Sequence, residues 1–285
     1  MLIGGLEAGG TKMVVAVGNE NGEILERATF PTLTPAETMP PMIEFFKKHK
    51  IEKLGIASFG PIDYKHGCVA DTPKPGWKDY PVKAAFEDAL GVKSGFDTDV
   101  NAAALAEYIL GAGKGKGSLL YVTIGTGIGG GFVSEGNMLH GLQHPEMGHM
   151  NLQSVEGDPM PDGACPYHKH CLEGLAAGPS LLKRWGKPGY ELPVDHAAWD
   201  IEAEYLAQMC QNAIMVLSPE VIVLGGGVMQ QKQLISKVRA KTLEKVNGYI
   251  RSSALTPEGI SSYIVEPGLG VNSGITGALM LGIKA

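Results

Sequence analysis

The feature that most constrains the fold is a short pattern that occurs twice. An apolar strand at residues 2–6 leads into a glycine-rich turn, and a second apolar strand follows at residues 13–17. Residues 119–124 and 131–133 flank another glycine cluster in the same way. Apolar runs of this length bounded by glycine are typical of strands joined by a tight turn. The repetition predicts the same strand–turn–strand device in two domains.

Glycine accounts for 40 of the 285 residues, about twice its usual share. The glycines gather in clusters beside apolar runs, which indicates tight turns or close approach of the backbone to a ligand. Backbone N–H groups in such turns can converge on a phosphate. A hairpin without a ligand is an equal alternative for any single cluster, but several together favour a phosphate site. The clusters are Glu7-Ala8-Gly9-Gly10-Thr11-Lys12, Gly125-Thr126-Gly127-Ile128-Gly129-Gly130-Gly131 and Gly225-Gly226-Gly227.

Strands alternate with helices along the rest of the chain, which predicts the α/β class. The helix signals are prolines that suit a first turn, an alanine-rich run that stops at a glycine, and apolar residues that recur on one helical face. The predicted strands lie at 24–30, 53–59 and 221–224, and the predicted helices begin at Pro40, span 102–110 and 206–217, and end the chain at 273–283.

Several protein classes are disfavoured by what the chain lacks. It has no Gly-x-x-x-x-Gly-Lys-Ser/Thr motif, and no Gly-x-Gly-x-x-Gly opens a helix after the first strand, which argues against P-loop and dinucleotide-binding enzymes. A net charge of −6 disfavours binding to nucleic acid. No run is apolar enough to span a bilayer and no secretion signal is present, so we expect a cytoplasmic protein without a membrane partner.

On these motifs the chain resembles the ROK sugar kinases of the actin/hexokinase-like ATPase superfamily, over nearly its whole length. Ser58-Phe-Gly-Pro-Ile-Asp63 and Thr72-Pro-Lys-Pro-Gly-Trp77 are similar to the fructokinase branch and resemble parts of its sugar pocket. The resemblance implies a two-lobed α/β fold of the actin/hexokinase-like (ribonuclease H-like) type with a central cleft. Residues 1–115 would form the first lobe, with a C-terminal helix at about 272–285 packing back on it. Residues 116–271 would form the second lobe, which carries a zinc loop.

The resemblance also implies a nucleotide site for ATP. The first two glycine turns would hold its phosphates, and the third cluster would lie near the adenosine. We expect Mg²⁺ to be held chiefly by ATP oxygens and water, as this ion prefers. Glu7 stands where the family most often has Asp, which leaves its part in metal coordination open. The implied ATP-binding residues are Gly9, Gly10, Thr11, Lys12, Gly125, Thr126, Gly127, Gly225, Gly226 and Gly227.

Transfer of a phosphoryl group to a sugar hydroxyl needs a base to accept the proton. Asp99 precedes the alanine-rich helix, and from the residues alone a helix cap is its commoner role. The resemblance implies that Asp99 is the catalytic base. Thr98 replaces the Asn that many ROK glucokinases carry at that position. The implied substrate-binding residues are Gly60, Pro61, Thr98, Glu146, His149 and Glu173.

Residues 144–173 form an irregular stretch that is rich in His, Cys, Pro and Gly. Two of the four cysteines, Cys165 and Cys171, lie there, whereas Cys68 and Cys210 look ordinary. Zinc favours thiolate and imidazole ligands in a closed tetrahedron, and the local spacing permits it. The resemblance implies a structural zinc that orders the loop carrying Glu146 and Glu173. The predicted ligands are His149, Cys165, His168 and Cys171, with His170 as the competing imidazole.

These features predict ATP-dependent phosphorylation of a hexose at the 6-hydroxyl, with D-fructose converted to fructose 6-phosphate. Glucose, mannose or an N-acetylated hexosamine are the alternative sugars. A sugar-responsive ROK repressor is a second alternative, but those proteins add an N-terminal helix-turn-helix, whereas the first strand here begins at residue 2. A non-catalytic sugar sensor is a third. The resemblance also implies a homodimer.

Overall fold

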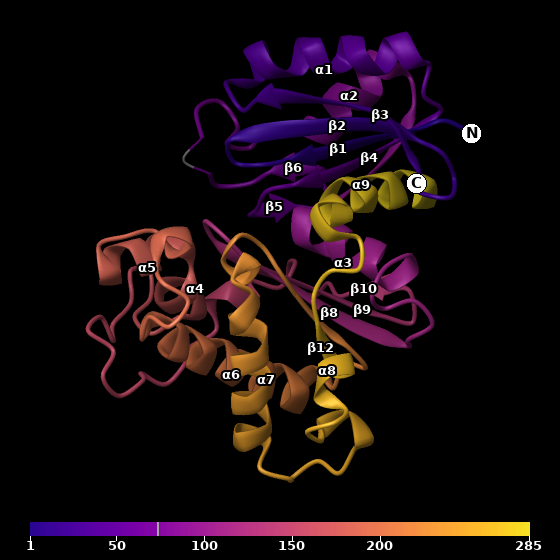
Figure 1. The fold of residues 1–285 in the computed structure, drawn as a ribbon. Coiled ribbons are helices and arrows are strands. Elements are labelled where there is room, and N and C mark those ends of the chain that lie inside the picture. The colour runs from indigo at the N-terminus through magenta and orange to yellow at the C-terminus, as the bar shows by residue number, and fades with distance from the viewer. Residues whose placement is uncertain (73) are drawn as a thin grey trace. The chain divides into compact units, whose positions relative to one another are not determined.

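The computed structural model describes residues 1–72 and 74–285, and the chain forms two compact units (Figure 1). Unit 1 comprises residues 1–115, 131–145 and 268–285, and unit 2 comprises residues 116–130 and 146–267. These ranges differ from the predicted lobes because residues 131–145 and 268–271 belong to unit 1. Hydrogen bonds hold both segments there, because the Ile62 N–H donates to the His144 ring and the Gly268 N–H donates to the Glu107 carboxylate.

Unit 1 is built on a five-stranded sheet of order β3-β2-β1-β4-β7. The pairs β1–β2 and β2–β3 are antiparallel, whereas β1–β4 and β4–β7 are parallel. Ala8 pairs with Ser58 and Ser58 pairs with Thr98, so three strands end side by side at one edge. The strands are β1 Ile3–Ala8, β2 Lys12–Gly18, β3 Ile24–Pro31, β4 Lys53–Ser58 and β7 Lys93–Thr98.

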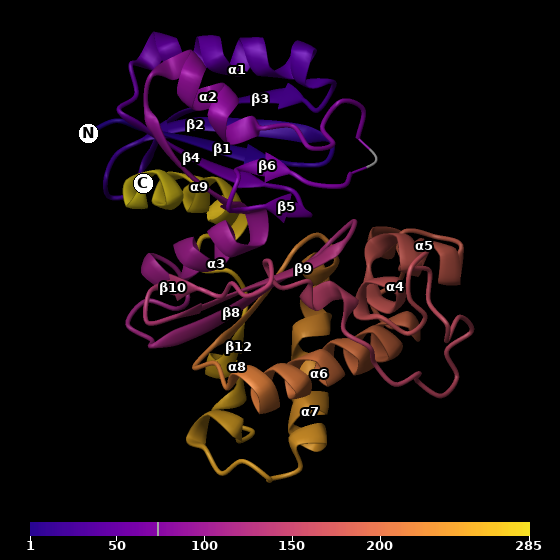
Figure 2. The same ribbon diagram turned by 180° about the vertical axis from the view of Figure 1, so that it is seen from behind.

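Helices cover both faces of this sheet (Figures 1 and 2). One core contains Leu6 and Ile56 of the strands together with Phe46 of α1 and Phe86 of α2. Neighbouring strand residues point the other way, as the pleat requires, and enter a second core with α3 and α9. The helices are α1 Pro35–His49, α2 Val82–Leu90, α3 Asp99–Ile109 and α9 Ser273–Lys284. The short strands β5 Ile62–Asp63, β6 Cys68–Val69 and β10 Asn137–Met138 complete unit 1.

Helix α9 lies unusually close to its neighbours because glycine occupies the contact points. A Cβ atom on Gly55 of β4 would fall 1.7 Å from the carbonyl oxygen of Ala278. On the other side of α9, a Cβ on Gly277 would fall 2.1 Å from the carbonyl oxygen of Ala102 in α3. Part of the glycine excess therefore serves helix packing rather than turns.

Helix α1 begins five residues before the predicted start at Pro40. Thr34 precedes it, and the Glu37 carboxylate accepts hydrogen bonds from the Thr34 hydroxyl at 2.5 Å and its backbone N–H at 3.3 Å. Thr-x-x-Glu is a capping-box pattern, so the sequence held a start signal ahead of Pro40 and Pro41. The prediction was wrong because it gave the two prolines the first turn, whereas they lie inside the helix.

Unit 2 contains most of a second sheet, of order β10-β9-β8-β11-β12. The parallel partners of β11 are β8 and β12. The long helix α6 packs against α7, and no helix in the described ranges is long and apolar enough to cross a membrane. The elements are β8 Ser118–Ile124, β9 Ile128–Ser134, α4 Leu172–Ala176, α5 Gly178–Trp185, α6 Ala198–Leu217, β11 Ile222–Gly225, α7 Lys232–Val246, α8 Ile260–Tyr263 and β12 Ile264–Val265.

The contact at Gly55 gives a direct test of this packing. Gly55→Ala forces its methyl group into the backbone of α9, so we expect the free energy of unfolding to fall by about 2–3 kcal/mol, as for overpacked cores. Denaturant unfolding measures the change. Gly141→Ala is the matched control, because no atom lies within 4 Å of its added Cβ. Equal stabilities of the two variants would contradict the close packing of α9 on β4.

Candidate active site and metal centre

The first glycine turn joins β1 to β2 at the edge of the unit 1 sheet where β4 and β7 also end. The Gly9 N–H donates to the Lys12 carbonyl at 2.9 Å, and the Thr32 hydroxyl donates to the Gly9 carbonyl at 2.8 Å. The Lys74 ammonium donates to the Gly10 carbonyl. Gly10, Thr11 and Lys12 are exposed. These three hydrogen bonds therefore hold the turn, while Gly10, Thr11 and Lys12 of the predicted phosphate site face solvent.

Glu7, at the end of β1, points into unit 1. A Cβ on Gly274 in the first turn of α9 would lie 2.4 Å from a Glu7 carboxylate oxygen. Burial raises the pKa of Glu7, and the positive charge of Lys12 partly opposes this rise. A helix N-terminus favours a nearby negative charge, so the start of α9 offsets some of the cost of burying this carboxylate.

The predicted base lies in the first turn of α3. The Thr98 hydroxyl accepts the Asn101 N–H at 3.1 Å and is therefore the N-cap of the helix. Asp99 is the first helical residue, and its carboxylate accepts the Val100 N–H at 2.9 Å. The cap role that sequence reasoning weighed for Asp99 thus belongs to Thr98. Thr98, a predicted sugar ligand, is only 3% exposed.

A buried acid–histidine pair supports this turn. Asp97 accepts the Thr98 N–H and the Asn101 side-chain amide, each at 2.8 Å, through one carboxylate oxygen. Its other oxygen lies 2.8 Å from Nε2 of His140. The hydrogen bond to Asp97 raises the pKa of His140, and a bond to the backbone of Met138 adds to the rise. Both carboxylate oxygens of Asp97 thus have partners.

The segment after β4 was predicted to belong to the sugar pocket. Gly60 and Pro61 come one residue after the end of β4 and are joined by a cis peptide bond. The Ile62 N–H donates to Nε2 of buried His144 at 3.1 Å. Trp77, from the second predicted sugar segment, is 1% exposed and donates from its indole to the Leu33 carbonyl at 2.6 Å. Trp77 is therefore a core side chain, and Pro73 of the same segment lies outside the described residues.

In unit 2, the second glycine turn is closed by an internal bond from the Gly125 N–H to the Gly127 carbonyl at 2.9 Å. The Gly178 N–H at the start of α5 donates to the Gly125 carbonyl at 2.8 Å. Glu173 of α4 accepts the Ile128 N–H at 2.9 Å. The predicted sugar ligand Glu173 therefore lies directly against the predicted phosphate turn, which exposes Thr126.

Two further predicted segments meet this turn. Gly226 has a left-handed φ of 93°, and a Cβ there would lie 2.3 Å from the carbonyl oxygen of Ile124. Gly148 packs on β9, where a Cβ would lie 1.8 Å from the carbonyl oxygen of Ile128. Glu146 precedes Gly148 in the exposed segment that enters the short helix Met147–His149. Unit 2 thus gathers Gly125–Gly127, Gly225–Gly227, Glu146 and Glu173.

The four predicted metal ligands also come together in unit 2. Ligand atoms of His149, Cys165, His168 and Cys171 all lie within 4.8 Å of one another. Nδ1 of His149 is 4.0 Å from Sγ of Cys165 and 3.7 Å from Sγ of Cys171. The competing imidazole, His170, instead lies 2.9 Å from the Pro161 carbonyl. The structure therefore groups His168, not His170, with the other three.

This cluster fits a tetrahedral metal ion. Zinc–sulfur and zinc–nitrogen bonds of about 2.3 and 2.1 Å give tetrahedral edges of roughly 3.5–3.8 Å. The separation of 3.8 Å between Sγ of Cys165 and Nδ1 of His168 matches such an edge. Two thiols and two imidazoles are a donor set that selects zinc over hard cations.

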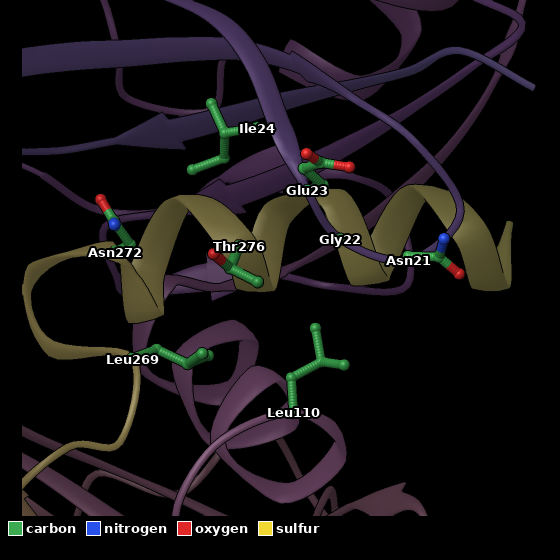
Figure 3. A pocket seen from close by; sticks show the side chains of 8 residues that line it. All are labelled: Asn21, Gly22, Glu23, Ile24, Leu110, Leu269, Asn272 and Thr276. Atoms are coloured by element: carbon green, nitrogen blue, oxygen red, sulfur yellow. The ribbon is translucent and has the colours of Figure 1, made fainter.

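Figure 3 shows a pocket of about 390 Å³ elsewhere in unit 1. It lies at the β2–β3 turn, which is the opposite end of β2 from the glycine turn. Two of its polar side chains have partners within the protein, since Glu23 binds Asn19 at 3.0 Å and Asn272 binds Arg27 at 3.4 Å. It contains none of the predicted site residues and does not suit phosphoryl transfer. The lining residues are Asn21, Gly22, Glu23, Ile24, Leu110, Leu269, Asn272 and Thr276.

Sequence reasoning missed Asp97, His140 and Lys74 as parts of the site. Asp97 lies only two residues before Asp99, yet nothing in the local pattern shows that it binds a histidine more than forty residues later. Lys74 lies in a segment that was predicted, but its contact with the first glycine turn depends on tertiary structure. Asp97 and His140 can be recognised only once the fold brings the acid and the histidine together.

Two α/β units, each with a glycine turn between adjacent strands, define the actin/hexokinase-like ATPase class, and the predicted α/β fold is confirmed. The ROK family model matches residues 3–285. The chain therefore belongs to the ROK family, as the sequence motifs predicted.

Proteins similar to this chain carry sugar kinase names. A fructokinase of Pediococcus pentosaceus is 44% identical over 286 residues, covering 99% of this chain and 97% of the relative. A fructokinase of Zymomonas mobilis is 41% identical, covering 100% of this chain and 97% of the relative. The crystal structure of a ROK hexokinase from Thermus thermophilus matches with a TM-score of 0.79 at 28% identity, covering 99% of this chain and 98% of that one.

Proposed function

We propose that this protein is an ATP-dependent hexose kinase that converts D-fructose to fructose 6-phosphate. The full-length similarity to fructokinases carries this proposal. The arrangement of unit 1 supports it, because the first glycine turn, the Gly60–Pro61 segment and Asp99 all leave the sheet at one edge. A nucleotide site, a sugar segment and a base are the parts that such a transfer requires.

In the proposed mechanism, Asp99 accepts the proton of the fructose 6-hydroxyl. The hydroxyl oxygen then forms a bond to the γ-phosphorus of ATP, and the bond from that phosphorus to the oxygen of the leaving ADP breaks. Asp99 lies in the first turn of α3, where the helix dipole favours its charged carboxylate. An ionised carboxylate is the form that can accept the proton.

The remaining groups bind and orient the two substrates. The backbone N–H groups of the two glycine turns, with the hydroxyls of Thr11 and Thr126, would bind the phosphates of Mg-ATP. Gly225–Gly227 would lie near the adenosine. Glu146, Glu173 and the Gly60–Pro61 segment would bind fructose hydroxyls. Oriented donors at the phosphates stabilise charge that develops during the transfer.

We also propose that the Cys/His cluster holds a structural Zn²⁺ through His149, Cys165, His168 and Cys171. Four protein ligands leave no position for water, so the ion would order the chain rather than take part in the reaction. Cys171 begins α4, and its sulfur accepts the Gly174 N–H at 3.4 Å. The metal would therefore fix the helix that carries Glu173.

A homodimer in the cytoplasm is our proposal for the state of the protein. All four cysteines are free thiols, which suits a reducing compartment. The dimer follows from the family resemblance, and a solution mass twice that of one chain would support it. A mass equal to one chain at working concentration would contradict it.

The first test of the function is a set of initial rates with Mg-ATP on fructose, glucose, mannose and N-acetylglucosamine. We expect a clear preference for fructose. Asp99→Asn should lower kcat by about 10²–10⁴-fold, the usual contribution of a general base. Asp88→Asn is the matched control, since Asp88 is an exposed acid on α2. No turnover on any sugar would overturn the function, and near-normal turnover of Asp99→Asn would overturn the base.

The metal proposal predicts one zinc ion per chain in protein purified without added metal. Cys171→Ser and His168→Ala should lose the metal and, because α4 loses its anchor, lower the melting temperature. Cys68→Ser and His170→Ala are the controls and should keep it. Elemental analysis and thermal unfolding with and without a chelator provide the readouts. A metal-free native protein, or zinc retained by Cys171→Ser, would refute the assignment.

A further inference from the structure

We propose that His140 is a positioning residue for the transfer reaction. It binds Asp97 below the first turn of α3 and stacks on Tyr64 beside the sugar segment, and so it fixes these two parts of unit 1 relative to each other. The inference rests on the proposed function, because it takes Asp99 as the base and Gly60–Pro61 as part of the sugar site.

The first contact of His140 is with the acid that organises the start of α3. Asp97 is 2% exposed and binds the Thr98 N–H and the Asn101 side chain through one oxygen. The other oxygen faces Nε2 of His140 at 2.8 Å. Asn101 is fully buried, and its Oδ1 has no hydrogen-bond partner among the described residues. Asp97 therefore orients the Asn101 amide, and His140 binds the carboxylate oxygen of Asp97 that remains.

The second contact of His140 is with the sugar segment. Its ring stacks on Tyr64, with centroids 4.6 Å apart and an interplanar angle of 31°. Tyr64 directly follows β5, and Ile62 of β5 donates its backbone N–H to His144 at 3.1 Å. Two histidines four residues apart thus hold one side of the same segment. His140 also contacts the Asn101 amide of α3, so it links the sugar segment to the turn that carries Asp99.

The charge of His140 is part of this link. Its imidazole binds the Asp97 carboxylate and the backbone of Met138, and both bonds favour the protonated ring and raise its pKa. The groups that face it are Asp97 from β7, the Asn101 amide from α3 and the Tyr64 ring, which also lies 5.8 Å from the Lys65 ammonium. Among the contacts described for the His140 ring, only Asp97 supplies a carboxylate. A charged imidazole therefore neutralises a buried acid two residues before the base.

His49 provides a matched control because it makes the same kinds of bond. Its Nδ1 lies 2.7 Å from the Phe45 carbonyl and its Nε2 lies 3.0 Å from the Glu26 carboxylate. It ends α1, however, on the other face of the sheet from α3. The variants His140→Ala and His49→Ala each remove one carboxylate-bound histidine from unit 1, and only the first is expected to change the reaction.

Kinetics on fructose and Mg-ATP test the link. We expect His140→Ala to lower kcat about 10- to 100-fold, because small misplacements of reacting groups have effects of this size. The KM for fructose should rise, whereas the KM for ATP should stay within about twofold, since ground-state nucleotide contacts are untouched. His49→Ala should keep all three values. Unchanged kcat and fructose KM in His140→Ala, or an equal loss in His49→Ala, would overturn the proposal.

The pH dependence of kcat gives a second test, because it would not change if His140 had only a structural role. The native pKa of His140 lies above its unfolded value, so its stabilising effect is present below the unfolded pKa and is lost as pH rises through the native pKa. We expect kcat of the native enzyme to fall in that same window. His140→Gln, which keeps a donor but cannot be charged, should lack this limb. An identical basic limb in His140→Gln would refute the role of the charge.

Histidine NMR on the native protein keeps the inference testable even where a variant does not fold. We expect one imidazole to stay protonated on both nitrogens above the usual histidine range, and Asp97→Asn to lower its pKa. If the native protein phosphorylated no sugar while this signal was present, the proposed function would fail and the Asp97–His140 pair would stand. A neutral His140 at pH 6, below the ordinary histidine pKa of about 6.5, would overturn the pair itself.

Discussion

The packing of helices α3 and α9 in unit 1 depends on the hydrogen bonds that the Glu107 carboxylate accepts. Fully buried near the end of α3, this carboxylate accepts the N–H groups of Ala112 at 2.9 Å, Gly268 at 2.9 Å and Leu269 at 3.0 Å. It also accepts the Ser273 hydroxyl at 2.7 Å at the first residue of α9. The chain first leaves unit 1 after Gly115 and enters it for the last time at Gly268. One buried acid thus fixes the end of α3, the departing and returning backbone, and the start of α9. Loss of such a carboxylate would leave several buried donors unsatisfied, at a cost of about 1–3 kcal/mol each.

This arrangement explains how the proposed base can be held rigidly at the start of a helix. Helix α3 is fixed by Glu107 at one end and by the Asp97, Thr98 and Asn101 contacts at the other. Between these ends it packs on α9, which itself lies against the sheet through Gly55. Asp99 therefore stands on a helix whose position is determined by close backbone contact, and close packing transmits small displacements instead of absorbing them. Groups that must be placed to within a fraction of an ångström are best carried by such an element.

The sequence predicted the elements that carry local signals and missed those that depend on distant partners. The strand–glycine–strand repeat, the α3 segment and the Cys/His cluster could be found because turns, alanine runs and Cys/His spacing are short-range patterns. Helix α1 was started too late because Pro40 and Pro41 obscured the Thr34–Glu37 signal. The pairing of Asp97 with His140 could not be seen, since its two members approach only when β10 folds against α3. Thr98 shows a subtler limit: either it or Asp99 could cap α3, and only the backbone geometry decides between them.

The Cys/His cluster lies in an irregular stretch of unit 2, whereas Glu107 connects the helices of unit 1. Residues 150–171 of unit 2 contain no helix or strand longer than an isolated bridge, so only scattered backbone hydrogen bonds hold their conformation. The proposed metal ion, held by side chains at both ends of this stretch, would add a cross-link, because the binding free energy of the ion becomes folding free energy. Cys171 connects the Cys/His cluster to helix α4, since its sulfur also caps this helix two residues before Glu173. The carboxylate of Glu173 in turn holds the Ile128 N–H at the second glycine turn. A metal ion in the cluster would thereby order both the predicted sugar ligand Glu173 and the predicted phosphate turn through the single turn of α4.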